Sequence, residues 1–179
     1  MFDQSLQTAR LTLRPFISGD QERVAELMNN WAVVRMLGMP LYPYTLADAD
    51  EFIAKQLARN TSAEHYASAI VTEAGLIGAI CVGPRNDAPS IGYWLGEPYW
   101  GQGYMTEALG VSVRAFFAAS AWDHLASGYF EDNAASSALQ RKFGFEITTE
   151  GLEPCVARGE KVRHFETRLT RATFEAQVA

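Results

Sequence analysis

Short runs of apolar residues recur along the whole chain, and many are rich in β-branched or aromatic side chains. In the first run Leu11 and Leu13 alternate with polar neighbours, which is the period of a strand that buries one face. A turn at Glu73-Ala74-Gly75 joins two later runs into a hairpin. The pattern predicts strands over residues 10–14, 66–72, 76–82, 90–95, 125–130, 146–149 and 162–169.

Between these runs, apolar side chains follow the spacing of a helix with one buried face. Ser18 with Gln21 resembles a capping box before the first such segment, and Thr45 with Asp48 fits the cap of the second. Gly144 stands where a left-handed residue usually closes a helix. Helices are predicted around Val24–Met28, around Phe52–Leu57, from Tyr104 to about Ala119, over Asn133–Phe143, and in a short segment at the C-terminus.

The order of these elements is a strand, two helices, three strands, a helix, a strand, a helix and then the last strands. This order predicts a mixed α/β (α+β) fold, with a single layer of sheet and helices on both faces. The segment Gly83–Pro89 is predicted to be a loop because of its turn-forming residues. Since no repeat or linker divides the chain, residues 1–179 are expected to form one domain.

The composition is that of an ordinary globular protein, with 48% hydrophobic and 20% charged residues. The formal net charge of -6 argues against binding to nucleic acid or to an anionic membrane, because both need a basic face. An acidic surface tolerates cationic partners such as amines or basic peptides. No apolar segment reaches the length of a membrane span, and the N-terminus lacks the features of a secretion signal, so we expect a cytoplasmic location.

The cysteines and histidines indicate neither a disulfide framework nor a metal site. Two cysteines are too few for such a framework, and Cys81 lies in an apolar run, where it is expected to be a small core residue. The three histidines do not have the spacing of metal ligands. We therefore expect a reduced protein without a metal.

A glycine-rich connection between a predicted strand and a predicted helix is the first candidate for chemistry. Gly101 and Gly103 let the backbone approach a ligand closely, and the first N–H groups of the following helix are unpaired at its positive end. Together they favour a phosphate or pyrophosphate site. The alternative is a turn that only starts the helix. The segment is not a P-loop, since no Gly-Lys-Ser/Thr follows, and it lacks the third glycine of a dinucleotide fingerprint.

Three segments resemble the GNAT acetyltransferase superfamily, and more narrowly its branch that acetylates the N-terminal amines of ribosomal proteins. They follow one another in the right order and at the right spacing, and the resemblance covers nearly the whole chain. The segments are Thr8–Pro15 with Asp20, then Ile91–Leu95 followed by Tyr99–Leu109, and finally Asn133–Ser136 leading to Lys142–Phe145.

The resemblance implies a mostly antiparallel, twisted sheet that splays around acetyl-CoA, the co-substrate of an N-acetyltransferase. One arm of the splayed sheet would pair through backbone groups with the pantetheine amides, and the glycine loop would hold the pyrophosphate. Asn133 and Ser136 would approach the pantetheine arm and the thiol from the other arm. The implied cofactor-binding residues are thus Tyr93, Trp94, Leu95, Gly101, Gln102, Gly103, Tyr104, Met105, Thr106, Asn133 and Ser136.

The chain departs from the family pattern at three positions. Trp100 and Met105 replace residues common in the wider loop pattern, and Met105 matters only if its side chain crowds the phosphate. Many members place a tyrosine in the second cofactor helix as general acid, where this chain has Gln140, which cannot fill that role. Ser136 is the nearest alternative hydroxyl. It is either catalytic or a first-turn serine that satisfies backbone N–H groups.

Four carboxylates are candidates for the general base. Glu131 and Asp132 lie at a strand end before Asn133, close to where the site should be, although Asp132 is equally suited to cap the helix. Glu97 has the position of a solvated loop charge, and Glu107 that of a charge complementing the helix dipole. Ser136 and Glu131 are our candidate catalytic residues.

The acceptor is expected to be a primary amine, on a peptide N-terminus or a small molecule. Tyr42-Pro43-Tyr44 is either a wall of its pocket or a cover over the core, and of Tyr129 and Phe130 one should face the cleft. The rival interpretation is a regulatory domain that binds CoA without turnover, favoured by Gln140. A third is a protein that binds another phosphorylated ligand. A homodimer is left open.

Overall fold

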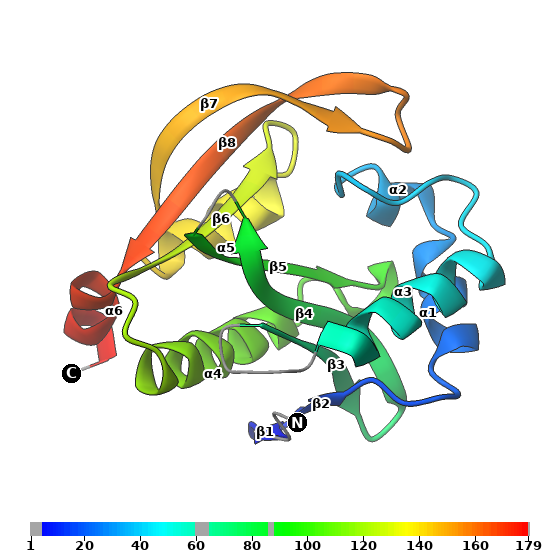
Figure 1. The fold of residues 1–179 in the computed structure, drawn as a ribbon, viewed down its shortest axis with the longest axis horizontal. Coiled ribbons are helices and arrows are strands. Elements are labelled where there is room, and N and C mark those ends of the chain that lie inside the picture. Colours follow the sequence, from blue (N-terminus) through cyan, green and yellow to red (C-terminus); the bar gives the residue numbers. More distant parts are fainter. Residues whose placement is uncertain (1–4, 60–64, 86–87, 179) are drawn as a thin grey trace.

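The computed structural model describes residues 5–59, 65–85 and 88–178. Within these residues, eight strands form one sheet in the order β1-β2-β3-β4-β5-β6-β8-β7 (Figure 1). Every neighbouring pair is antiparallel except β5 and β6. The strands are β1 (Leu6–Gln7), β2 (Thr12–Pro15), β3 (Tyr66–Thr72), β4 (Gly75–Arg85), β5 (Ala88–Leu95), β6 (His124–Phe130), β7 (Glu146–Cys155) and β8 (Glu160–Thr170).

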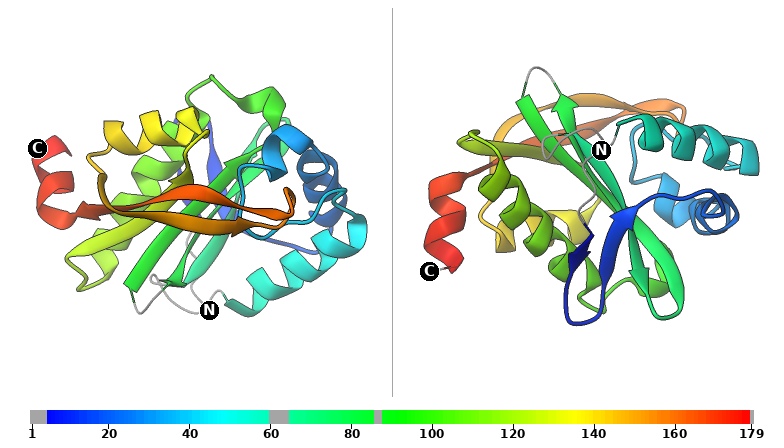
Figure 2. Two further views of the ribbon diagram at one scale, coloured as in Figure 1. Left: turned by 90° about the horizontal axis from the view of Figure 1, so that it is seen from above. Right: turned by 60° about the horizontal axis from the view of Figure 1, so that its bottom comes forward.

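Helices cover both faces of this sheet, which confirms the predicted mixed α/β architecture (Figure 2). One group packs over a core that contains Val24, Ile53 and Ala79, and the other over a core that contains Leu109, Ile80 and Leu169. The first group is α1 (Gln21–Met28), α2 (Trp31–Val34) and α3 (Leu46–Arg59); the second is α4 (Tyr104–Ala119), α5 (Ala134–Lys142) and α6 (Arg171–Val178), and a 3-10 turn, η1 (Glu97–Tyr99), precedes α4.

The centre of the sheet opens between β5 and β6. These parallel strands share a single register pair, Ser90 with Ala126. Beyond this pair, the residues of β5 and β6 are not paired with each other. On the outer side β5 stays paired with β4 as far as Leu95, and β6 stays paired with β8 as far as Phe130. The two halves of the sheet therefore diverge after Ser90, as the family resemblance implied.

Several caps and turns confirm the sequence patterns, but one does not. Thr45 and Asp48 exchange hydrogen bonds at the start of α3 as a capping box does. Gly144 has a φ of 82° after α5. The expected capping box at Ser18 is wrong, because α1 begins after Asp20, and the Asp20 carboxylate accepts hydrogen bonds from Arg14 and from the N–H of Ile17.

The predicted loop over Gly83–Pro89 is also wrong for the residues described. β4 continues to Arg85 and β5 begins at Ala88, with Pro84 opposite Pro89 in the register; Asn86 and Asp87 lie outside the described residues. Proline is tolerated near a strand end, where a lost N–H breaks few ladder bonds. The Arg85 side chain donates to Glu166 of β8, which holds this end of the hairpin against the other half of the sheet.

Strand β7 was predicted to end at Thr149 but continues to Cys155, whereas β8 is only slightly longer than predicted. Their hairpin reaches over to the segment after α2, where the Val156 N–H donates to Gly38 O and the Cys155 thiol to Leu37 O (Figure 1). Across the described part of the chain, no helix is long and apolar enough to cross a membrane, and no His, Cys, Asp or Glu cluster suits a metal.

Candidate active site

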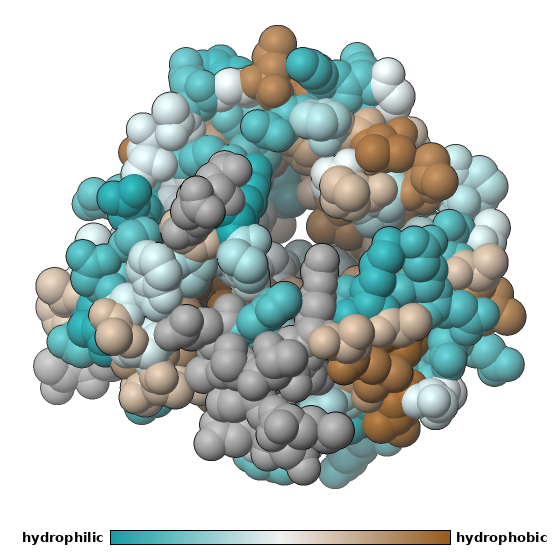
Figure 3. Space-filling view, viewed as in Figure 1, coloured by the Kyte–Doolittle hydropathy of each residue, from teal (hydrophilic) through white to brown (hydrophobic). Residues whose placement is uncertain are grey.

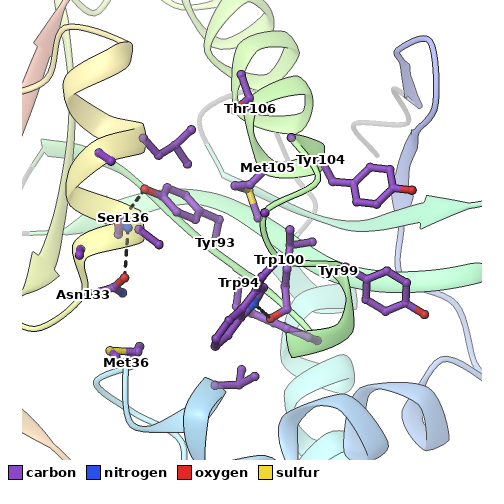
Figure 4. Close-up of a pocket in the computed structure, with 18 of the residues that line it drawn as sticks. Met36, Tyr93, Trp94, Tyr99, Trp100, Tyr104, Met105, Thr106, Asn133 and Ser136 are labelled. Atoms are coloured by element: carbon purple, nitrogen blue, oxygen red, sulfur yellow. Dashed lines mark hydrogen bonds between the residues drawn. The ribbon is translucent and has the colours of Figure 1, made fainter.

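A cavity of about 660 Å³ lies where β5 and β6 diverge. Its walls come from the end of β5, the connection to α4, the first turns of α4 and α5, and the segment after α2 (Figure 4). Of the eleven residues expected to bind the cofactor, ten line it: Tyr93, Trp94, Leu95, Gly101, Gly103, Tyr104, Met105, Thr106, Asn133 and Ser136. The structure thus brings together segments that are far apart in the chain.

The glycine connection has the backbone that an anion site needs. Gly101 has a φ of 70° and Gly103 a φ of 80°, both in the region that favours glycine. Gly103 is the N-cap of α4 and offers no side chain, so the N–H groups of Tyr104, Met105 and Thr106 have no acceptor within the helix. The positive end of α4 and these N–H groups meet at one wall of the cavity.

Arg10, which was not predicted to belong to the site, precedes β2 and supports this loop. Its guanidinium donates to Gln102 O over 2.9 Å and to Glu107 Oε1 over 2.6 Å, and it lies 4.4 Å from the centre of the Tyr104 ring. Thr8 also donates to Glu107. Gln102 does not line the cavity, and its side chain donates to Pro98 O.

Glu107 is therefore engaged in holding the loop. Burial acts to raise its pKa, but the hydrogen bonds from Thr8 and Arg10 together outweigh this and leave the pKa below its usual value. Since the carboxylate pairs with Arg10 and does not line the cavity, it is poorly placed as a base.

Across the cavity, two hydroxyl groups from different elements meet. Asn133 caps α5 by accepting a hydrogen bond from the Ser136 N–H at 3.1 Å. The Ser136 hydroxyl lies 2.9 Å from the Tyr93 hydroxyl, which comes from β5 (Figure 4). Burial raises the pKa of Tyr93, so the phenol stays protonated. Ser136 was predicted from the sequence, whereas for Tyr93 only a role of its backbone groups was predicted.

The remaining candidate bases are bound to other groups or lie outside the cavity. Asp132 lines it but pairs with Arg158 and Arg35; the hydrogen bond from Arg158 is the largest cause of its lowered pKa. Glu97 accepts a hydrogen bond from Asn30, and Glu131 is exposed and does not line the cavity. None of the four candidate carboxylates is both free and turned to the cavity.

Of the two alternatives for Tyr42-Pro43-Tyr44, the structure favours a place away from the cavity, because none of these residues lines it. Tyr44 is buried in the core beneath α1 and α3, and Tyr42 packs against Trp31 with ring centres 5.4 Å apart. Tyr129 packs against Phe165, and Phe130 joins a small cluster with Cys155. The cavity is lined instead by Trp94, Tyr99, Trp100, Tyr104 and the aliphatic residues Val33, Met36 and Leu37.

The surface on the side shown in Figure 3 is hollowed near its centre. Hydrophobic side chains gather on one side of this hollow and hydrophilic ones on the other (Figure 3). The segment between α2 and α3 carries the exposed side chains Met39, Leu41 and Tyr42, and β7 is exposed along nearly its whole length.

Comparison with known proteins identifies the family to which this chain belongs. The family model of the acetyltransferase (GNAT) domain matches residues 10–146. The ribosomal-protein-S5-alanine acetyltransferase of Vibrio fischeri is 19% identical, with a TM-score of 0.79, and the match covers 94% of this chain and 97% of that one.

Two further structures were solved with ligands. The microcin C7 self-immunity acetyltransferase MccE, in complex with acetyl-CoA and AMP, is 18% identical with a TM-score of 0.78, and the match covers 91% of this chain and 93% of that one. The ribosomal L7/L12 α-N-protein acetyltransferase RimL, in complex with coenzyme A, is 20% identical with a TM-score of 0.76, over 91% of this chain and 95% of that one. The chain belongs to the GNAT acetyltransferase family, whose members are N-acetyltransferases.

Proposed function

We propose that the protein moves the acetyl group of acetyl-CoA to a primary amine while both substrates are bound. The observation that carries this proposal is the cavity itself. It has an anion-binding helix start at one wall and a protonated hydroxyl pair at another, between two diverging strands. The first feature suits a pyrophosphate and the second a leaving sulfur.

Three parts of the cavity would hold acetyl-CoA. The N–H groups of 103–106 suit the pyrophosphate, and the backbone of Tyr93–Leu95, which has no ladder partner on the cavity side, suits the pantetheine amides. Asn133 and Ser136 also line the cavity, where they would flank the thiol end. The fit is supported by MccE and RimL, which were solved with acetyl-CoA and coenzyme A, respectively.

In the reaction, the amine nitrogen forms a bond to the thioester carbonyl carbon and the carbon–sulfur bond breaks. The bonding electrons go to sulfur, and the proton that the nitrogen loses ends there. A thiol with a pKa near about 8.5 is a tolerable leaving group. The Ser136 hydroxyl stabilises the charge on sulfur by donating a hydrogen bond.

We propose an α-amine as the acceptor rather than a lysine side chain. An α-amine with a pKa near about 8 is roughly one-tenth neutral at pH 7, whereas a lysine with a pKa near about 10.4 is neutral in fewer than about one molecule in a thousand. A weak base or water is enough for the first, and the carboxylates near the cavity are already paired.

A panel of acceptors tests the proposal. The purified protein is mixed with acetyl-CoA and with peptides that have a free N-terminus, and thiol release is followed with a thiol-reactive dye. The matched control is each peptide with a blocked N-terminus and an internal lysine; we expect release only with the free α-amine. Tight CoA binding without thiol release from any amine would favour the regulatory domain. A thermal shift with a nucleotide but not with CoA would favour another phosphorylated ligand.

A further inference from the structure

The side chain of Gln140 is almost completely buried, with 1% of its surface exposed, directly behind the hydroxyl pair. It stands one helical turn after Ser136 on the same face of α5. Its Nε2 lies 3.2 Å from the Ser136 hydroxyl and 3.2 Å from the Tyr93 hydroxyl. The proposed function leaves this buried amide without a role.

The environment fixes which way the amide points. Its Oε1 accepts a hydrogen bond from the Thr167 hydroxyl at 2.6 Å. At the other end, Nε2 is 3.3 Å from Gly128 O and 3.1 Å from the Ser127 hydroxyl, which donates its own hydrogen to Ile91 O. With the amide reversed, Oε1 would face the carbonyl oxygen of Gly128, which cannot donate. The donor end of Gln140 therefore faces the hydroxyl pair.

This orientation decides where the hydroxyl hydrogens go. Because Nε2 can only donate, neither Ser136 nor Tyr93 can give its hydrogen to Gln140. One hydroxyl donates to the other across 2.9 Å, which leaves one hydrogen over. Among the residues that the structure describes, no further acceptor for it is recorded, and both residues line the cavity.

We propose that Gln140 is a positioning residue that turns the remaining hydroxyl hydrogen of the Ser136–Tyr93 pair into the cavity, toward the sulfur of the bound thioester. The inference rests on the proposed function and deepens it. Gln140 stands where many family members have a tyrosine, and in this chain the hydroxyl comes instead from β5 and from the start of α5. Gln140 itself touches neither substrate.

Gln140→Met tests this with a side chain of similar length that cannot donate. We expect kcat to fall about tenfold, the effect of one hydrogen bond worth roughly 1.4 kcal/mol, while the KM for acetyl-CoA changes less than about threefold. Gln140→Glu, of the same shape, places an acceptor there, draws the hydroxyl hydrogens inward, and should lower kcat at least as far. Ile53→Ala, buried on the opposite face of the sheet, controls for lost stability.

A double-mutant cycle separates positioning from a structural role. In a Ser136→Ala/Tyr93→Phe background no hydroxyl is left to orient, so Gln140→Met should change kcat less than about twofold. An equal loss in both backgrounds, or a rise in KM with kcat unchanged, would overturn the inference.

A second measurement does not depend on turnover. CoA is titrated with alkali on the protein, and the thiolate is followed by its ultraviolet absorbance. We expect the pKa of the bound thiol to be about one unit lower in the wild type than in Gln140→Met, which is the same tenfold effect. Equal values refute the inference even in a protein that does not transfer acetyl. A wild type that binds no CoA refutes the proposed function, and this inference with it.

Discussion

The backbone at Gly103 gives a prediction whose size follows from the structure. Gly103 has a φ of 80°, where an L-residue is strained by about 1–2 kcal/mol. A Cβ there would also lie 3.3 Å from Arg10 Nη2, the atom that donates to Gln102 O. In Gly103→Ala the loop can relieve the strain only by leaving the conformation that presents the first-turn N–H groups of α4.

If that conformation binds the pyrophosphate, the strain must be restored on binding. We expect the affinity of Gly103→Ala for CoA to fall about 5- to 30-fold, with little change in thermal stability. The branched side chain of Gly103→Val should abolish detectable binding. Isothermal titration with CoA measures the affinity, and a thermal melt measures the stability of the same samples.

Two other glycines serve as controls. Gly101 has a φ of 70° and open space at its Cβ, so Gly101→Ala introduces backbone strain without a contact to Arg10. Gly151→Ala, in β7, introduces neither backbone strain nor a close contact. A Gly103→Val protein that is folded and binds CoA within twofold of wild type would refute the assignment of the loop. So would a Gly103→Ala protein whose melting temperature falls by about 2–8 °C while its affinity is unchanged, because the strain would then be held in both states.

Three ionisable groups give further predictions. Glu107→Gln removes the charge that pairs with Arg10, so CoA affinity should fall about threefold at low salt and less at high salt; equal losses at both would contradict this. The pKa of Asp132 is lowered, chiefly by the hydrogen bond from Arg158. The ionised carboxylate therefore adds to the free energy of unfolding at neutral pH, and this stabilisation is lost as the pH falls through the folded-state pKa. Asp132→Asn should therefore be less stable to urea at pH 7 by about 1 kcal/mol, a difference that narrows in acid. Burial lowers the pKa of His164, so the stability of the wild type should begin to fall below about pH 6.5, and His164→Gln should show a smaller fall in the same denaturation series.

The elements that were predicted well are those whose bounds depend on local sequence patterns. The predicted bounds of the long helix agree with those of α4, because its apolar face is continuous and a glycine precedes it. The bounds of β3 also agree. By contrast, the extent of β7 depends on its pairing with β8, and its exposed residues show little of the alternation that a strand with one buried face would have.

The backbone features of the site could be predicted from the sequence, but the contacts between its side chains could be predicted only in part. The glycine loop and the cap at Asn133 are local features, and both line one cavity. The pairing of Tyr93 with Ser136 joins residues 43 positions apart, and no local pattern reveals it. One signal was present: Gln140 lies one turn from Ser136, so the helix spacing places both polar side chains on the same face of α5.

The gap between β5 and β6 also bears on how this protein avoids aggregation. A strand with unpaired N–H and C=O groups is normally a template for a strand of another chain, and proteins protect such edges at the rim of a sheet. Here the stretch of β5 after Ser90 has no strand partner on the β6 side, and it lies in the middle of the sheet, flanked by the starts of α4 and α5 and by the segment after α2. A strand of another chain is too wide to reach this edge without passing between these helices. A thin, unbranched ligand arm can reach it through the cavity. The molecule can thus keep an open hydrogen-bonding edge for a small partner without offering it to other proteins in a crowded solution.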